Sequence, residues 1–153
     1  MSTNSHLDPA RVIALSSDAV HSKKRLFEFA ATALRDAFEL DTETIYKALL
    51  SREKLGSTAL GGGIAIPHCR IPECTDAAGC LITLGNGIDF NAPDGLPVDV
   101  AFVLLVPTQA TEQHLNILAQ LATAFSKPDL RLALLGAPSG DKAWTVLTER
   151  MNL

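Results

Sequence analysis

The stretch from Val98 to Val106 restricts the fold more than any other part of the sequence, because it is almost continuously apolar and lies between Pro97 and Pro107. An unbroken apolar run is typical of a strand that is covered on both faces, since a half-exposed strand alternates apolar and polar residues. Helical patterns precede and follow this run. We therefore predict that it is the central strand of an α/β layer architecture, in which a mixed sheet carries helices on both faces.

Capping residues mark the expected helices. Apolar residues recur every three or four positions after Ser22, which predicts a helix over Ser22–Glu39 with Ser22 as its N-cap. Asp41 predicts the N-cap of a second helix, which runs to about Lys54. Three further helices are predicted to begin at Thr108 or Thr111, at Pro128 and at Ser139.

The other expected strands are shorter. They are Arg11–Leu15, which is either an edge strand or a helical turn, Ile64–Ile66, Gly79–Leu84 and Ile88–Phe90. The sequence Gly85-Asn86-Gly87 predicts a turn between the last two, and the segment from Arg70 to Ala77 is predicted to be a loop. Residues 1–153 are expected to form a single domain, with residues 1–10 as a loose arm.

Composition limits the partners and the compartment. The 153 residues are 47% hydrophobic and 20% charged, which suits one domain with a sizeable core. The formal net charge of −4, without a long basic run, disfavours nucleic acid as a partner. No targeting signal or membrane-length apolar stretch is visible, so we expect a cytoplasmic protein without membrane insertion. The three cysteines give no sign of a disulfide framework and are expected to be reduced thiols.

One short motif presents a histidine. Gly61-Gly62-Gly63 precedes the apolar residues Ile64–Ile66, and Pro67 then stands directly before His68. Glycine allows a turn or a close backbone approach, and proline ends a strand ladder. We therefore expect His68 at a strand end, where reactive loops commonly begin.

Several kinds of site lack the residues that they need. His68, Cys69, Cys74 and Cys80 show no metal-ligand spacing, so no metal or other cofactor is expected. The glycine run lacks the remainder of a phosphate-binding or dinucleotide motif, and no nucleophile elbow of a serine hydrolase is present. Cys69 is better explained as a small buried residue than as a catalytic thiol.

Two histidines and an arginine remain as candidates. Neutral imidazole is a good nucleophile near pH 7, so His68 could accept and return a phosphoryl group. Arg52 could hold phosphoryl oxygens through a two-pronged contact, although its proximity to His68 depends on the fold. His114 lies in the first turn of a helix, where an anion is favoured, but it could equally be a capping or core histidine.

The segments that carry these residues resemble a known family. Arg52-Glu53-Lys54-Leu55-Gly56-Ser57-Thr58 and the motif from Gly61 to His68 are similar to the active-site signature of mannitol/fructose-type enzyme IIA domains of the bacterial phosphoenolpyruvate phosphotransferase system. The resemblance extends from about Ser22 to the C-terminal helix. It implies a mixed, mostly parallel five-stranded sheet with helices on both faces.

The resemblance also implies a function. His68 would be the phosphorylated nucleophile, His114 and Arg52 would stabilise the phosphoryl group, and an HPr-type histidine phosphocarrier would be the donor. The stand-alone length and the segments Ser22–Arg25 and Arg52–Lys54 most resemble nitrogen-regulatory members, which signal to target proteins through their phosphorylation state. The alternatives are a sugar-specific IIA that passes phosphate to a IIB component, and a regulatory binding module that does not depend on phosphorylation.

Two features depart from simple expectations. Many family members have glycine where this chain has Cys69. Glycine adopts a positive φ freely but cysteine does not, so the backbone would be strained if the fold required a positive φ at this position. Lys23, Lys24 and Arg25 have the wrong sign for the start of a helix, which means that their cost is tolerated or that they contact a partner.

Overall fold

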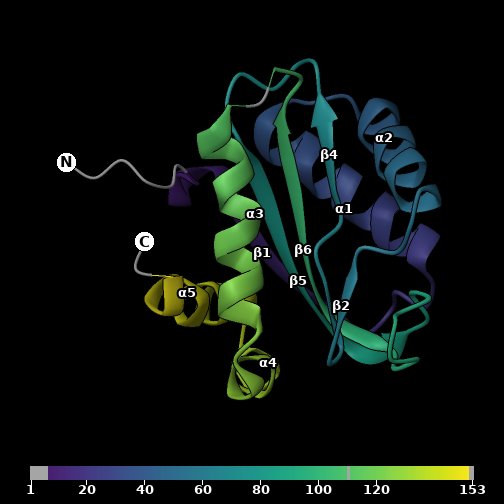
Figure 1. Cartoon of the computed structure of the whole chain (residues 1–153), viewed down its shortest axis with the longest axis vertical. Helices are drawn as coiled ribbons and strands as arrows, with labels where there is room; N and C mark the ends of the chain where they lie inside the picture. The colour runs from purple at the N-terminus through teal and green to yellow at the C-terminus, as the bar shows by residue number, and fades with distance from the viewer. Residues whose placement is uncertain (1–6, 110, 152–153) are drawn as a thin grey trace.

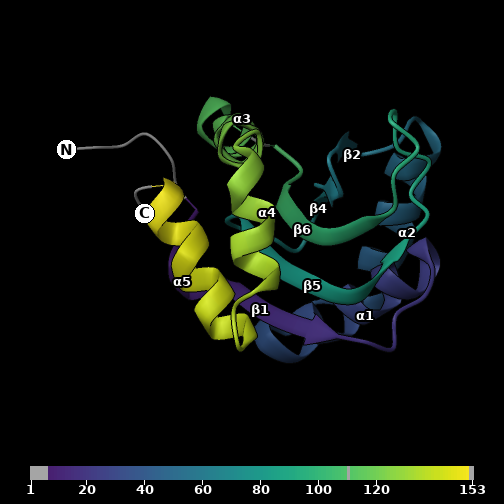
Figure 2. The same cartoon turned by 90° about the horizontal axis from the view of Figure 1, so that it is seen from below.

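A computed structural model describes residues 7–109 and 111–151 as a three-layer α/β structure, with one sheet between two layers of helices (Figures 1 and 2). The sheet is mixed, in the order β1-β5-β6-β3-β2, and β4 also pairs with β6. The strands are β1 (Val12–Ser17), β2 (Ala59–Gly61), β3 (Ile64–Ala65), β4 (His68–Ile71), β5 (Ala78–Ile88) and β6 (Val98–Pro107). As predicted, β6 lies inside the sheet, and eight of its ten residues are buried.

The described part of the sheet has six strands instead of the expected five, because one strand is interrupted. β3 and β4 both run parallel to β6, at Val100–Ala101 and at Leu104–Pro107 respectively. Pro67 separates them, since proline has no N–H for the ladder, but its carbonyl still accepts from the Leu104 N–H at 2.8 Å. β1–β5, β3–β6 and β4–β6 are parallel pairs, while β5–β6 and β2–β3 are antiparallel.

The helices begin where capping side chains can accept from their first free N–H groups. Ser22 caps α1 (Lys23–Phe38), Asp41 caps α2 (Thr42–Lys54) and Thr111, rather than Thr108, caps α3 (Glu112–Phe125). Pro128 begins α4 (Pro128–Leu135), and the Ser139 side chain accepts from Lys142 N at the start of α5 (Gly140–Met151). The sequence therefore located these helix starts correctly.

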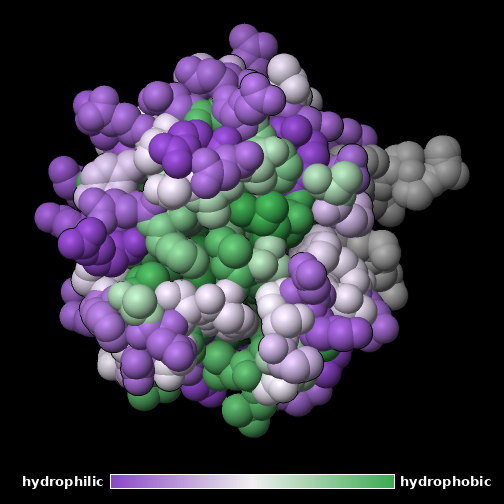
Figure 3. All heavy atoms as spheres, turned by 180° about the vertical axis from the view of Figure 1, so that it is seen from behind, coloured by the Kyte–Doolittle hydropathy of each residue, from purple (hydrophilic) through white to green (hydrophobic). Residues whose placement is uncertain are grey.

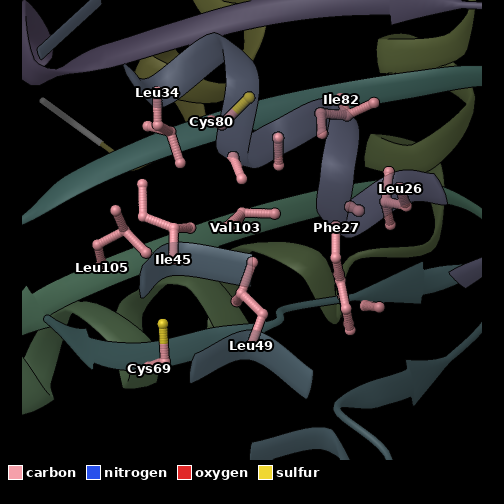
Figure 4. Packing of buried hydrophobic residues seen from close by; sticks show 14 of the residues in the cluster. Leu26, Phe27, Leu34, Ile45, Leu49, Cys69, Cys80, Ile82, Val103 and Leu105 are labelled. Atoms are coloured by element: carbon pink, nitrogen blue, oxygen red, sulfur yellow. The ribbon is translucent and has the colours of Figure 1, made fainter. Parts of the chain in front are cut away.

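Apolar residues on the two faces of the sheet form separate clusters. The first packs the sheet against α1 and α2 and includes Phe27, Ile45, Leu49 and Leu105 (Figure 4). The second packs the other face against α3, α4 and α5. The near-continuous apolar pattern of β6 follows from this double coverage, because both of its faces meet helices.

Three sequence expectations were wrong. β5 runs through Gly85-Asn86-Gly87 without a turn, and Ile88 pairs with Val98 after a register shift. The loop predicted from Arg70 begins later, because Arg70 and Ile71 belong to β4. Leu7 is buried and residues 9–11 form a short 3-10 helix, so they are not part of a loose arm, while residues 1–6 lie outside the described residues.

The face covered by α1 and α2 carries an apolar region when viewed from behind (Figure 3). A groove of about 930 Å³ lies on this side, and Phe29 and Tyr46 are among its lining residues. It contains none of the predicted site residues. No helix in the described part of the chain is long and apolar enough to span a membrane.

Candidate functional site

The three predicted site residues line one cleft. This cleft has a volume of about 510 Å³ and is formed by α2, β4, the end of β6 and the start of α3. Arg52 comes from the last turn of α2, His68 opens β4 and His114 lies in the first turn of α3. The parallel pairing of β4 with β6 places His68 beside Leu104, close to the point where the chain leaves the sheet for α3.

The glycine run makes the hairpin that leads to His68. Gly61, Gly62 and Gly63 all have positive φ, which glycine adopts without the strain that other residues would incur. A Cβ atom on Gly63 would lie 2.6 Å from Arg131 Nε, so this glycine also allows a close approach. Both uses of glycine that the sequence predicted are therefore present.

The His68 ring is held by the backbone just before it. Its Nδ1–H donates to the Ile66 carbonyl at 2.7 Å. A carbonyl oxygen only accepts, so Nδ1 carries the proton of the neutral ring and Nε2 keeps a free lone pair. Because Pro67 interrupts the ladder between β3 and β4, the Ile66 carbonyl is positioned for this contact.

The environment of His68 keeps its ring neutral. Burial lowers the pKa of His68 below its ordinary value, and the positive charge of Arg52 lowers it further. The Ile66 carbonyl and Glu53 act in the opposite direction but are outweighed. The imidazole is therefore available as a nucleophile at neutral pH.

Hydrogen bonds and an ion pair stabilise the turn that carries Arg52. Its Nη1 donates to the Gly56 carbonyl at 2.9 Å, just after α2 ends. The neighbouring Glu53 accepts from the Thr58 backbone N–H and hydroxyl and pairs with Lys23 Nζ at 3.0 Å. Lys23 thus has an internal partner, which offsets the unfavourable charge at the start of α1.

His114 is held in the opposite sense. Its Nδ1 accepts from the Thr111 backbone N–H at 3.1 Å, while the Thr111 hydroxyl accepts from the His114 N–H, which makes a capping box. Nδ1 is therefore unprotonated and Nε2 carries the proton. The Nε2–H points to Asp76 Oδ1 at 3.3 Å.

Cys69 does not strain the site. The positive-φ residues in the described part of the chain do not include it, and it lies within β4. The side chain is buried against α2 in the first core cluster, together with Cys80 (Figure 4). Burial raises the pKa of Cys69 to about 12, so this thiol is a poor nucleophile. All three cysteines are free and buried.

Two further residues of the site, Arg70 and Asp76, were not predicted from the sequence. Arg70 also lines the cleft, and its Nη1 donates to the Thr108 carbonyl at 3.2 Å. Its position two residues after His68 on a strand was a signal, because such residues share a face. Asp76 is separated from His114 by 38 positions and had no such signal. No cluster of metal-binding side chains occurs among the residues described.

Solved structures share this fold. The chain has a TM-score of 0.82 and 40% identity to the nitrogen regulatory protein IIA-Ntr from Neisseria meningitidis, over 93% of this chain and 96% of that one. The mannitol IIA of Escherichia coli has a TM-score of 0.73 at 21% identity, covering 93% and 99% of the two chains. The expected architecture, a mixed sheet between helices, is therefore confirmed.

Sequence relatives give the same class. A nitrogen regulatory protein of Pseudomonas aeruginosa is 44% identical over 132 residues, which is 86% of each chain. Residues 7–150 match the family model described as phosphoenolpyruvate-dependent sugar phosphotransferase system, EIIA 2. The chain belongs to this family of IIA proteins, and nitrogen regulatory proteins are among its relatives.

Proposed function

We propose that the chain is a histidine phosphocarrier that accepts a phosphoryl group on His68 from an HPr-type protein and acts as a nitrogen-regulatory IIA protein. The observation that carries the proposal is the His68 ring, whose Nδ1–H is donated to the Ile66 carbonyl at 2.7 Å within the cleft that Arg52 and His114 also line. This geometry leaves Nε2 as the attacking atom.

The transfer is an exchange between two imidazoles. His68 Nε2 forms the new N–P bond as the N–P bond of the donor phosphohistidine breaks, and the breaking bond leaves its electron pair on the donor nitrogen. No proton has to move, because His68 Nδ1–H remains on the Ile66 carbonyl throughout. Catalysis then consists of positioning and charge stabilisation.

Positive groups in the cleft suit the charge of a phosphoryl group. Arg52 offers a planar set of donors, and Arg70 adds a second guanidinium on the face of β4 that carries His68. His114 contributes an Nε2–H at the N-terminal end of α3, where the helix dipole also favours an anion. These donors support the proposed roles of Arg52 and His114.

The rim of the cleft suits a protein donor. Leu55 and Leu115 both line the cleft, with exposed fractions of 84% and 48%. Exposed leucines beside a reactive group are typical of a surface that a protein partner covers. A phosphorylated carrier protein fits such a rim better than a small free phosphate donor.

The nitrogen-regulatory role rests on the relatives that bear this name at 44% and 40% identity. A sugar-specific role is the second candidate, because a fructose-specific EIIA component of Haloferax volcanii is 33% identical over 146 residues, 95% of this chain. Transfer of labelled phosphate from the protein to a fructose- or mannitol-type IIB component separates the two roles. Rapid transfer to IIB would favour sugar uptake.

The test of phosphorylation uses phosphoenolpyruvate, enzyme I and an HPr-type carrier. We expect the wild-type protein to take up label that is stable to alkali and labile to acid, and His68→Ala to take up none. Cys69→Ala is the matched control at the next position and should be labelled like the wild type. Equal labelling of His68→Ala would refute the assignment, and partner binding that ignores the label would favour a binding module.

A further inference from the structure

The neutral His114 ring has one N–H group, and this group already donates a hydrogen bond to the Asp76 carboxylate. Nδ1 is occupied by the Thr111 N–H at 3.1 Å, so the neutral ring can donate only through Nε2, which faces Asp76 Oδ1 at 3.3 Å. The imidazole is 13% exposed, whereas the Asp76 side chain is 54% exposed. A phosphoryl group on His68 would need the same proton that Asp76 accepts.

Asp76 is held in place independently of His114. Its Oδ1 also accepts from the Ala77 backbone N–H at 3.1 Å. Arg11 Nε donates to the Ala77 carbonyl at 2.9 Å, which ties this turn to the start of β1. These contacts hold the Asp76 carboxylate beside the first turn of α3, where it accepts from His114.

We infer that Asp76 is a positioning residue that competes with the phosphoryl group for His114. In the unphosphorylated protein the Nε2–H of His114 is donated to Asp76, and phosphorylation of His68 draws it to a phosphoryl oxygen while Nδ1 keeps the Thr111 N–H. This inference rests on the proposed function, since it names what His114 does in each state. Apart from the new N–P bond on His68, only these hydrogen bonds change.

Charge gives the exchange its direction. A phosphoryl group carries a charge of about −1.5 to −2 near pH 7, more than one carboxylate, and the Asp76 carboxylate is exposed enough for water to replace the His114 contact. Asp76 nevertheless opposes phosphorylation, because breaking its hydrogen bond offsets part of the new one.

The test is the equilibrium between the protein and its phosphorylated HPr-type donor. Asp76→Ala removes the competing acceptor, so we expect the ratio of phosphorylated to unphosphorylated protein to rise about 3- to 10-fold, the effect of one net hydrogen bond. Asp76→Asn keeps an acceptor for the Ala77 N–H without the charge, and should give a smaller rise. Glu73→Ala is the matched control, because it removes an exposed acid from the same segment.

A second measurement isolates the route through His114. In a His114→Ala background, Asp76→Ala should have no further effect, and nitrogen NMR of the wild-type imidazoles should show the His114 Nε2 signal move on phosphorylation. The exchange is overturned if Asp76→Ala raises the ratio of phosphorylated to unphosphorylated protein no more than Glu73→Ala does. It is also overturned if the rise persists in the His114→Ala background. Absence of label on wild-type His68 would instead overturn the proposed function itself, and with it the exchange.

Discussion

The two histidines of the cleft are held in opposite ways, although each ring is fixed through Nδ1. His68 donates its Nδ1–H to a backbone carbonyl, whereas His114 accepts a backbone N–H at the same atom. Nε2 is therefore a lone pair in the first ring and an N–H in the second. This difference suits the proposed roles, in which His68 attacks phosphorus and His114 donates to the phosphoryl oxygens.

The difference shows that the backbone beside a histidine sets its chemistry. The interruption between β3 and β4 at Pro67 supplies a carbonyl, while the first turn of α3 supplies an unpaired N–H. The Thr111 hydroxyl also lies 3.0 Å from His114 Nδ1, but a backbone group contacts Nδ1 in each ring, so the tautomers follow from the ends of secondary-structure elements. The contrast can be tested by changing one ring, one cap or the pH.

The largest effect is expected from removing the second ring. His114→Ala should slow phosphoryl transfer to His68 by about 10²- to 10³-fold, the usual cost of one lost stabilising donor. His114→Gln is the matched variant, because glutamine at this position preserves the capping box and offers an amide donor. In single-turnover labelling, the transfer rate of His114→Gln should lie between those of the wild type and His114→Ala. An unchanged rate in His114→Ala would leave this residue with a capping role alone.

A smaller effect is expected from the cap. Thr111→Ala removes the hydroxyl that accepts from the His114 N–H and lies 3.0 Å from His114 Nδ1, and should lower the free energy of unfolding by about 1 kcal/mol in denaturant titrations. Transfer should remain close to the wild-type rate, because the Thr111 backbone N–H still orients the ring. A large loss of transfer with little loss of stability would contradict this separation.

The smallest effect is expected from pH. The pKa of His68 is lowered in the folded protein, so the unfolded chain binds more protons between the folded pKa and about 6.5. The stability linked to His68 should be fully present above about pH 6.5 and should be lost as the pH falls through the folded pKa. Unfolding titrations at several pH values should show this slope in the wild type and its reduction in His68→Gln.

Local signals predicted much of the fold. Ser22, Asp41 and Thr111 cap helices as their residue types indicate, and the apolar run of β6 is buried as its pattern requires. These features depend on neighbours along the chain, so one sequence contains them. The helix starts and the central strand could therefore be located without the structure.

The failed turn in β5 has a physical explanation. Gly85 and Gly87 do not have positive φ but allow close approach, since Cβ atoms there would lie 2.1 Å from Asp18 Oδ1 and 2.7 Å from Pro97 Cβ. Gly-Asn-Gly permits a turn without requiring one, and the pairing of Thr83 and Ile88 with β6 on either side keeps the segment extended. Which use of glycine applies depends on contacts that are distant in sequence.

By itself, the sequence determined which residues could do the chemistry, while the backbone contacts of both rings are local but were seen only in the structure. Both Nδ1 contacts span only two or three residues, from Ile66 to His68 and from Thr111 to His114. Only the tertiary structure decided that α2, β4 and α3 converge on one cleft and that Asp76 reaches His114. The physical reason is that strand order and register bring distant segments together, and no local pattern encodes that pairing.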